Sequence, residues 1–347
     1  MVEMMRKADY LIIGQGLAGT LLAWFLLERG KSVYIVDQTF PGASSPVAAG
    51  IFNPITGRRF VKTWLADEIF PFAEQTYRTL EMVTGAKFYH PKRIIRQIAT
   101  AAERQEWERK ASRPEYETYL KSEQQNELPR DVEILGGGNL DVGEFIRRMA
   151  TYFRERELLE DGMVDHRQVS IGNERVVWRG TEARRMIFCE GYRVLKNPWF
   201  GKLPFTHAKG ELLTIHAPGL QQEHILNRGI FILPLGGDRY KVGATYDWDD
   251  LSAETTINAR EEIIEKLKKI LDIKYEVIDH EAGIRPTVKD RRPTLGIHPD
   301  YPQLGLFNGL GTKGVSLGPY FAHHFTEHLV EGIPLIDAVD IKRFDLR

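Results

Sequence analysis

Residues 9–19 are Asp-Tyr-Leu-Ile-Ile-Gly-Gln-Gly-Leu-Ala-Gly, a short apolar run that leads into the pattern Gly14-x-Gly16-x-x-Gly19. The first glycine permits a tight turn, the second lets the backbone approach a pyrophosphate, and the third lets a helix pack closely on a strand. A second apolar run, residues 32–37, ends in Asp37, which could accept hydrogen bonds from a ribose. This order of elements predicts a dinucleotide site with its diphosphate at a helix N-terminus. The motif alone leaves open whether the dinucleotide carries nicotinamide or flavin.

The composition is that of an ordinary globular protein. The chain has 347 residues, 42% of them hydrophobic and 27% charged, and this length favours two lobes. A net charge of -1 gives no general basic character that would attract nucleic acid or an anionic membrane. We therefore expect a small-molecule substrate and no nucleic-acid partner, while the oligomeric state stays open.

The cysteine content and the apolar runs bear on the compartment. Cys189 is the only cysteine, which excludes an intrachain disulfide and a zinc cluster and fits a reducing compartment. Residues 1–9 carry mixed charge and no apolar core typical of a signal peptide. The run 17–27 is too short to span a bilayer and fits a crossover helix that ends before Gly30. We expect a cytoplasmic protein with no membrane span and no bound metal.

The periodicity of the chain predicts a mixed fold. We expect helices over residues 64–83, 101–110, 139–153 and 258–271, and a last helix that ends at Val330. We expect strands over residues 93–99, 163–171, 183–188, 211–215, 230–233, 240–245 and 305–309, with a small-residue loop over 39–54. The terminal parts therefore look α/β, whereas residues 205–250 look like an antiparallel meander in an α+β region.

Four later segments carry further patterns: GASSPVAAGI at 42–51, MIFCEG at 186–191, ILPLGGDRYKVGAT at 232–245, and AGIRP at 282–286 followed by NGLGTKG at 308–314. With the first motif they resemble, over roughly residues 8–335, the FAD-dependent D-amino acid oxidase superfamily, in particular its glycine oxidase and sarcosine oxidase-like branch. The resemblance implies an FAD-binding Rossmann-like domain (glutathione reductase type 2) with an interleaved antiparallel-sheet substrate domain. It assigns residues 1–88, 137–200 and 282–347 to the FAD-binding domain and residues 89–136 and 201–281 to the substrate domain.

The resemblance also implies FAD as the cofactor, held without a covalent bond because no cysteine lies near the C-terminal loop. It places Asp37 and Gln38 at the adenosine ribose and Val169 at the adenine. Residues around the diphosphate and the isoalloxazine ring complete the predicted site. The full set is Gly14, Gly16, Leu17, Ala18, Gly19, Asp37, Gln38, Ser44, Ser45, Ala49, Gly50, Ile51, Val169, Gly191, Gly311, Thr312, Lys313, Gly314 and Val315.

Arg285 is the candidate for the substrate carboxylate, because a guanidinium binds a carboxylate through two parallel hydrogen bonds. The alternative is a structural ion pair with Asp290 or Glu281. The chain departs from glycine oxidase at three positions: Phe231 replaces a tyrosine that grips the carboxylate, Leu235 replaces an arginine, and Thr312 replaces another arginine and is followed by Lys313. The basic residues Arg58, Arg59 and Lys62 form either a solvated patch or an anion-binding rim, and a lysine such as Lys209 could tune the chemistry or be structural.

The function implied is that of an FAD-dependent oxidoreductase. It would oxidise the C–N bond of a small amino acid or secondary amine by hydride transfer to flavin N5, with oxygen as the electron acceptor. Arg285, Lys313, Phe231 and Arg58 are the candidate residues on the substrate side. An FAD-dependent 2-hydroxy acid or polyol-phosphate dehydrogenase is the first alternative. A tRNA-modification oxidase and an NAD-dependent dehydrogenase are lower alternatives.

Overall fold

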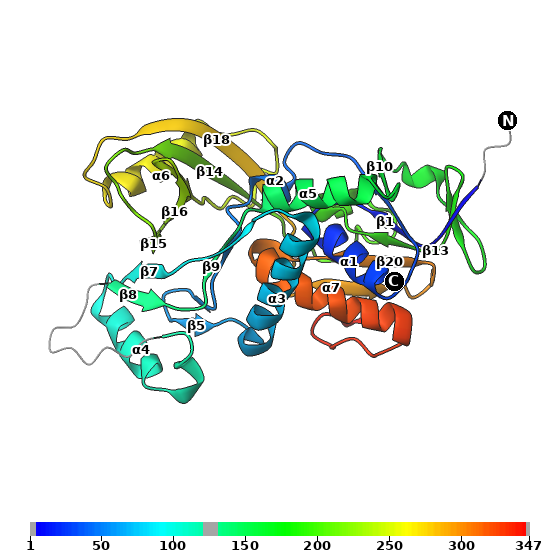
Figure 1. Ribbon diagram of the computed structural model, residues 1–347, viewed down its shortest axis with the longest axis horizontal. Helices are drawn as coiled ribbons and strands as arrows, with labels where there is room; N and C mark the ends of the chain where they lie inside the picture. The colour runs from blue at the N-terminus through cyan, green and yellow to red at the C-terminus, as the bar shows by residue number, and fades with distance from the viewer. Residues whose placement is uncertain (1–4, 121–130, 345–347) are drawn as a thin grey trace.

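The computed structural model describes residues 5–120 and 131–344, which form two lobes side by side, each built around one β-sheet (Figure 1). Residues 1–4, 121–130 and 345–347 of the predicted domain ranges lie outside the described residues. The two predicted sheet regions are therefore present, one largely parallel and one largely antiparallel.

The first sheet brings the two ends of the chain together. Its main order is β10 (Leu159–Asp161), β2 (Val33–Asp37), β1 (Arg6–Ile13), β13 (Thr181–Phe188), β12 (Val176–Trp178) and β11 (Ser170–Ile171). Strand β20 (Leu304–Asn308) pairs with β13, and β19 (Thr294–Ile297) pairs with β20. The pairs β10–β2, β2–β1, β1–β13 and β13–β20 are parallel, as the βαβ pattern predicted.

Helices cover this sheet because their apolar residues can be buried only against it and against one another. Helix α1 (Leu17–Glu28) is apolar on almost every side and is buried from Leu17 to Leu26 except at Ala18. Helix α7 (Gly314–Glu331) packs on α1 and on α3 (Ala66–Thr84). Helix α5 (Val142–Arg154) begins at an Asp141 cap whose carboxylate accepts the Glu144 backbone N–H at 2.9 Å.

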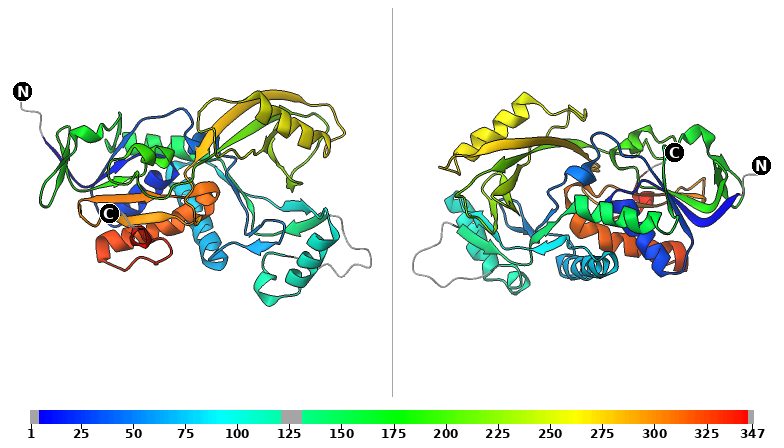
Figure 2. Two further views of the ribbon diagram at one scale, coloured as in Figure 1. Left: turned by 180° about the vertical axis from the view of Figure 1, so that it is seen from behind. Right: turned by 45° about the horizontal axis from the view of Figure 1, so that its top comes forward.

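The second sheet forms the other lobe. Its order is β18 (Glu276–Arg285), β14 (Ala208–His216), β17 (Arg239–Gly243), β16 (Phe231–Gly236), β15 (Ile225–Asn227), β7 (Ile94–Gln97) and β8 (Asp131–Ile134). The predicted meander is confirmed, since β14, β16 and β17 pair antiparallel. Strand β15 pairs parallel with β7, so the sheet is mixed. Helix α6 (Ile257–Lys268) lies over its outer face (Figure 2), where Ile263 and Leu267 join the core of this lobe.

Short elements link the two lobes. They are α2 (Ser44–Val47), β3 (Ile51–Phe52), β4 (Ile55–Thr56), β5 (Val61–Lys62), β6 (Tyr89–Pro91) and β9 (Gly138–Leu140). Helix α4 (Ala101–Ala111) lies at the far end of the second lobe (Figure 1). The described part of the chain has 3-10 turns at Pro114–Tyr116, His166–Gln168, Gly191–Lys196, Gly311–Lys313 and Ile341–Arg343.

Several predicted elements differ from the structure. The predicted strand 163–171 is mainly irregular, with only Ser170–Ile171 paired. The predicted helix 139–153 begins three residues later, because Asn139 and Leu140 belong to β9. The boundary predicted between residues 281 and 282 falls inside β18, so Arg285 belongs to the second sheet. Within the described ranges, no helix is long and apolar enough to cross a membrane.

Candidate active site

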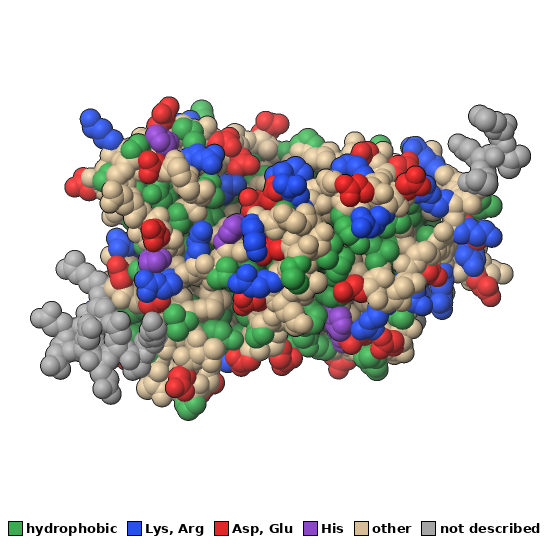
Figure 3. Space-filling view, in the orientation of Figure 1, with side chains coloured by type: hydrophobic (Ala, Val, Ile, Leu, Met, Phe, Trp, Pro, Cys, Tyr) green, Lys and Arg blue, Asp and Glu red, His purple; other side chains and the backbone are tan. Residues whose placement is uncertain are grey.

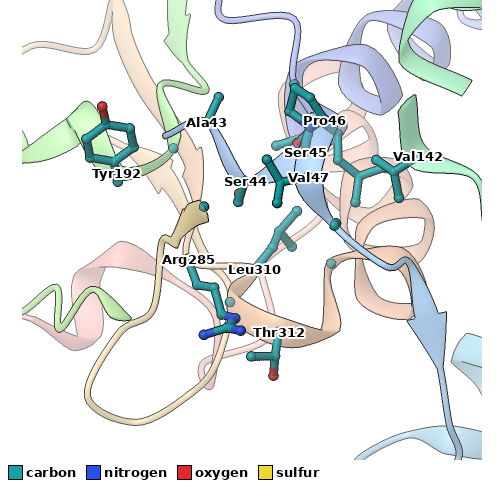
Figure 4. Close-up of a pocket in the computed structure, with 18 of the residues that line it drawn as sticks. Ala43, Ser44, Ser45, Pro46, Val47, Val142, Tyr192, Arg285, Leu310 and Thr312 are labelled. Carbon is teal, nitrogen blue, oxygen red and sulfur yellow. The ribbon is translucent and has the colours of Figure 1, made fainter. Parts of the chain in front are cut away.

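A cavity of about 810 Å³ runs from the first sheet to the second (Figure 4). The turn from β1 to α1, the segment around α2, and the turn from β20 to α7 line it on one side. Residues of β14, β16, β17 and β18 line it on the other side. Of the predicted cofactor residues, all but Gly19 and Val169 line this cavity: Gly14, Gly16, Leu17, Ala18, Asp37, Gln38, Ser44, Ser45, Ala49, Gly50, Ile51, Gly191, Gly311, Thr312, Lys313, Gly314 and Val315.

The glycines of the first motif have distinct structural roles. Gly14 has a φ of 103°, a conformation that favours glycine. A β-carbon on Gly19 would overlap the carbonyl oxygen of Gly14, so Gly19 serves the packing of α1 on the turn although it does not line the cavity. Gly16 is the N-cap of α1 and has no side chain between the helix start and the cavity. The N-cap of α1 therefore has no capping side chain of its own, which leaves room for a phosphate at the start of the helix.

Two side chains complete this end of the cavity. The Ser45 hydroxyl accepts the Leu17 backbone N–H at 3.2 Å, which joins α2 to the start of α1. Asp37 lies at the end of β2, and its Oδ1 accepts the Gln15 backbone N–H at 2.7 Å. Burial raises the pKa of the Asp37 carboxyl, although the Gln15 hydrogen bond opposes this shift. An acid positioned in this way has its second oxygen available to a ribose hydroxyl.

Val169 does not line the cavity, and its expected role, which is to offer backbone groups to the adenine, stays a prediction. It packs against the core of the first lobe, whereas Val164, five residues earlier, lines the cavity. The residues between them form an irregular segment with a 3-10 turn, so a strand pattern could not fix which valine faces the cavity.

The centre of the cavity is lined by small residues. Gly50 has a φ of 66°, and a β-carbon there would overlap the carbonyl oxygen of Leu140. Gly311 has a φ of 54° and opens the turn that leads into α7. Together with the helix start and Asp37, these residues fit a dinucleotide that ends in a flat ring, and hence FAD.

Arg285 ends β18, and its guanidinium points into the cavity toward Thr312 (Figure 4). Its Nη1 donates to the carbonyl oxygens of Lys209 at 3.2 Å and Thr245 at 3.3 Å, and its Nη2 donates to Thr245 at 3.4 Å. The guanidinium carbon lies 4.4 Å from the centre of the Tyr246 ring. Burial lowers the pKa of Arg285. The site thus holds a desolvated cation on neutral partners.

The ion pairs considered for Arg285 are not formed. Asp290 accepts from Arg343 at 2.8 Å, and Glu281 pairs with Lys241 at 2.9 Å. Over residues 5–120 and 131–344, no carboxylate pairs with Arg285. A β-carbon on Gly210 would overlap the Arg285 guanidinium, so this glycine makes room for it.

Phe231, Thr312 and Lys313 line the same cavity. The Lys313 Nζ donates to the Thr63 hydroxyl at 3.4 Å. Burial, and then the charges of Arg292 and Arg291, lower the pKa of Lys313. The cavity therefore has two cationic side chains, Arg285 and Lys313, at its substrate end.

Arg58 lies elsewhere, which corrects the prediction that it serves the site. Its side chain is 93% exposed, and its Nε lies 4.0 Å from Glu103. Lys62 pairs with Asp67 at 2.6 Å and donates to the Glu115 carbonyl oxygen. None of Arg58, Arg59 and Lys62 lines the cavity, because the short β4–β5 hairpin turns this segment toward α4. The reading as a solvated patch fits this placement better than an anion-binding rim.

Lys209 is also structural. Its side chain is 1% exposed, and its Nζ donates to Asp250 at 2.5 Å and lies 3.5 Å from Glu211. His207 donates from Nε2 to the Tyr192 carbonyl oxygen when the imidazole is neutral, and burial lowers its pKa to about 4. Neither residue lines the cavity.

Sequence reasoning missed several residues that line the cavity, above all Tyr246, Asn227 and Gln15. Gln15 lies inside the glycine motif and could have been found from its position. Tyr246 directly follows the conspicuous Val-Gly-Ala-Thr segment, yet nothing in the local pattern indicates that its ring contacts Arg285.

Comparisons with known proteins agree with an FAD-dependent oxidoreductase. Residues 9–328 match the model of the DAO family, described as FAD dependent oxidoreductase. The chain is 23% identical to a glycine oxidase of Bacillus licheniformis, over 91% of each protein. It is 23% identical to the tRNA 5-methylaminomethyl-2-thiouridine biosynthesis bifunctional protein MnmC of Marinobacter nauticus, where it covers 92% of this chain but only 55% of that protein. The chain thus spans about half the length of this curated relative.

Among solved structures, iminodiacetate oxidase from Chelativorans superposes with a TM-score of 0.78 at 21% identity, covering 95% of this chain and 98% of the other. Glycine oxidase from Geobacillus kaustophilus superposes with a TM-score of 0.76 at 20% identity, covering 99% of each. At these identities the superpositions show a shared fold.

Proposed function

Because the chain belongs to the DAO family of FAD-dependent oxidoreductases, we propose that it oxidises the C–N bond of a small amino acid or secondary amine that carries a carboxylate. Family membership makes FAD the cofactor and removes the NAD-dependent alternative. When bound, FAD supplies the acceptor for the hydride that leaves the carbon next to the amine, and we propose oxygen as the final electron acceptor.

The main support for this proposal is that Arg285 faces the cavity without a carboxylate partner in the described part of the chain. It is a desolvated cation that faces the cavity, and the acids that could have paired with it bind Arg343 and Lys241 instead. A guanidinium in this state gains most from a carboxylate that arrives with the ligand. Binding a carboxylate at Arg285 would fix the orientation of the amine and its neighbouring carbon.

Lys313 is the candidate for handling the amine proton. Its lowered pKa makes the neutral Nζ more available than that of an exposed lysine, and it lies in the same cavity. In this proposal Nζ accepts the proton that the substrate ammonium must lose before oxidation. Phe231, which has no hydroxyl, contributes an apolar wall and leaves Arg285 as the principal grip on the carboxylate.

The test starts from the visible spectrum of the purified protein, which should be that of a flavoprotein. Acid precipitation should release all the flavin, and flavin retained by the precipitate would contradict non-covalent binding. Amines with a carboxylate should bleach the flavin without oxygen, and admission of oxygen should then yield peroxide. Bleaching by 2-hydroxy acids or polyol phosphates, and not by amines, would establish the first alternative instead.

A second candidate is the oxidation of an amine side chain on tRNA. It is favoured by the match to the MnmC relative over most of this chain. The surface offers less support, because basic and acidic side chains are intermixed on the face shown in Figure 3. Binding of unmodified and modified tRNA, measured by gel shift at physiological salt, distinguishes this candidate from a small-molecule oxidase.

A further inference from the structure

Two exposed aromatic rings lie beside the substrate end of the cavity. Tyr246 is 54% exposed and Trp248 is 60% exposed. Their ring centres are 5.9 Å apart and their planes differ by 23°, so the rings are stacked. All six tryptophans fall within the described residues, and Trp248 is the only one of them that is exposed. Leaving two large rings in water costs free energy unless they have a partner.

The pair is continuous with the cavity. Tyr246 lines the cavity and lies against the Arg285 guanidinium, and Trp248, which does not itself line the cavity, stacks with Tyr246. A ligand whose carboxylate binds Arg285 therefore has this surface next to its remaining atoms.

The segment that carries the rings is fixed in place on both sides of Tyr246. Residues Thr245 and Asp247 hydrogen-bond to β14: Glu211 N donates to the Thr245 hydroxyl at 2.9 Å, and Lys209 N donates to the Asp247 carbonyl oxygen at 2.7 Å. Asp247 Oδ1 then accepts the backbone N–H groups of Asp249 and Asp250, both at 2.9 Å. These bonds pre-organise Tyr246 and Trp248 and lower the entropy lost when a ligand stacks on them.

The buried charges behind this segment hold its later part. Lys209 Nζ donates to Asp250 at 2.5 Å and to the Ser252 hydroxyl at 3.2 Å. The Glu211 carboxylate accepts both the backbone N–H and the hydroxyl of Thr256, at 2.8 and 2.9 Å. The proposed reaction does not use the buried charges of Lys209 and Glu211. Their hydrogen bonds hold the chain that follows Trp248 in place.

The acidic residues beside Trp248 limit which ligands can stack on its ring. Asp247 and Asp249 are exposed and flank Trp248 in the sequence. Carboxylates at this position repel phosphate groups and tolerate a neutral or cationic ring.

We propose that Tyr246 and Trp248 form a subsite for a planar, uncharged or cationic ring carried by the substrate, beside the carboxylate site at Arg285. This inference rests on the proposed function for the carboxylate site and extends it: the substrate class is a ring-bearing amino acid or N-substituted amino acid. Trp248 is a specificity-determining residue in this assignment.

The experiment measures binding to the holoenzyme without turnover, so that it does not depend on finding the true substrate. Dissociation constants of propionate and 3-phenylpropionate are measured by calorimetry for the wild type, Trp248→Ala and Trp248→Phe. Tyr301→Ala is the control, because Tyr301 is a 40% exposed aromatic that does not line the cavity. The wild type should bind the ring-bearing acid about tenfold more tightly, as expected for a stacking contact.

Trp248→Ala should lower that ratio to about two or less, whereas Trp248→Phe and Tyr301→Ala should retain most of it. An equal ratio in the wild type and Trp248→Ala would overturn the subsite. So would a change of oligomeric state on Trp248→Ala with an unchanged ratio, because the rings would then belong to an interface. Failure of every amine to bleach the flavin would refute the proposed reaction while leaving this comparison intact.

Discussion

Amines that carry a carboxylate should reduce the flavin faster than matched amines without one, and Arg285→Ala should abolish most of this difference in rate. The substitution removes the guanidinium that points into the cavity and leaves any substrate carboxylate buried without a cation. Loss of one partner of a buried charge pair costs about 3–5 kcal/mol. We therefore expect kcat/KM for flavin reduction by an amino acid to fall by about two to four orders of magnitude.

Arg285→Lys separates charge from geometry. Lysine keeps one positive charge but cannot form two parallel hydrogen bonds, and its shorter head cannot reproduce the contacts to the Thr245 carbonyl oxygen. We expect a loss of about tenfold to thirtyfold, equivalent to about 1.4–2 kcal/mol. The remaining charge should keep carboxylate-bearing amines ahead of matched amines without a carboxylate.

The assay is anaerobic flavin reduction in a stopped-flow instrument, with each amino acid compared with the corresponding carboxamide. Arg184→Ala, an exposed arginine on β13, is the matched control for loss of one positive charge. Thermal unfolding and flavin content show whether each variant is folded. If folded Arg285→Ala slows the acid and the amide by the same factor, Arg285 does not bind the carboxylate and the reasoning is refuted.

Three further predictions follow from the same structure. Gly210→Ala should reproduce the Arg285 phenotype, because its β-carbon would overlap the guanidinium. By contrast, the β-carbon of Gly143→Ala on α5 would make only ordinary contacts, 3.6 Å from Asp141 Oδ1 and 3.8 Å from the Pro46 carbonyl oxygen, so this variant should behave as wild type in the flavin-reduction assay. Gly19→Ala should weaken FAD binding at least tenfold, measured by titration of the apoprotein, because its β-carbon would push α1 away from the turn; unchanged affinity would contradict the packing role. Burial lowers the pKa of His207 to about 4 in the folded protein, compared with roughly 6.5 in the unfolded chain. Between about pH 4 and pH 6.5 the unfolded chain therefore binds more protons at His207 than the folded protein does. The free energy of unfolding should therefore fall by up to about 3 kcal/mol between pH 6.5 and pH 4, and His207→Gln should flatten that slope in urea titrations; an unaltered slope would exclude His207 as its source.

Much of the first lobe was predictable because its signals are local. Apolar runs and glycines at fixed spacing determine a strand, a turn and a helix within about 30 residues. The helices α1, α3 and α7 were predicted to within a few residues for the same reason. The prediction failed at residues 163–171, where a short apolar alternation gives no strand because only two residues find a partner.

The pairing of distant segments was beyond the reach of local patterns. Strand β7 pairs in parallel with β15, more than 100 residues later, and nothing in either short run specifies that partner. Arg58 was predicted to serve the site because it follows the small-residue loop 39–54 in the sequence. In the structure, the hairpin β4–β5 places its side chain near Glu103 instead.

The sequence by itself therefore determined the cofactor end of this protein: the glycine motif, Asp37 and the segments that resemble an FAD-binding family. Only the tertiary structure decided which groups contact Arg285 and that no carboxylate among the described residues pairs with it. Its contacts with Lys209 and Thr245 join residues 76 and 40 positions apart, and they arise from the alignment of β14 and β18. The same alignment buries Lys209 and Glu211 and fixes the segment with Tyr246 and Trp248. Binding a phosphate needs mainly a local backbone shape. The environment of Arg285, a partly buried cation beside an aromatic ring and without a carboxylate partner in residues 5–120 and 131–344, depends on which distant residues meet.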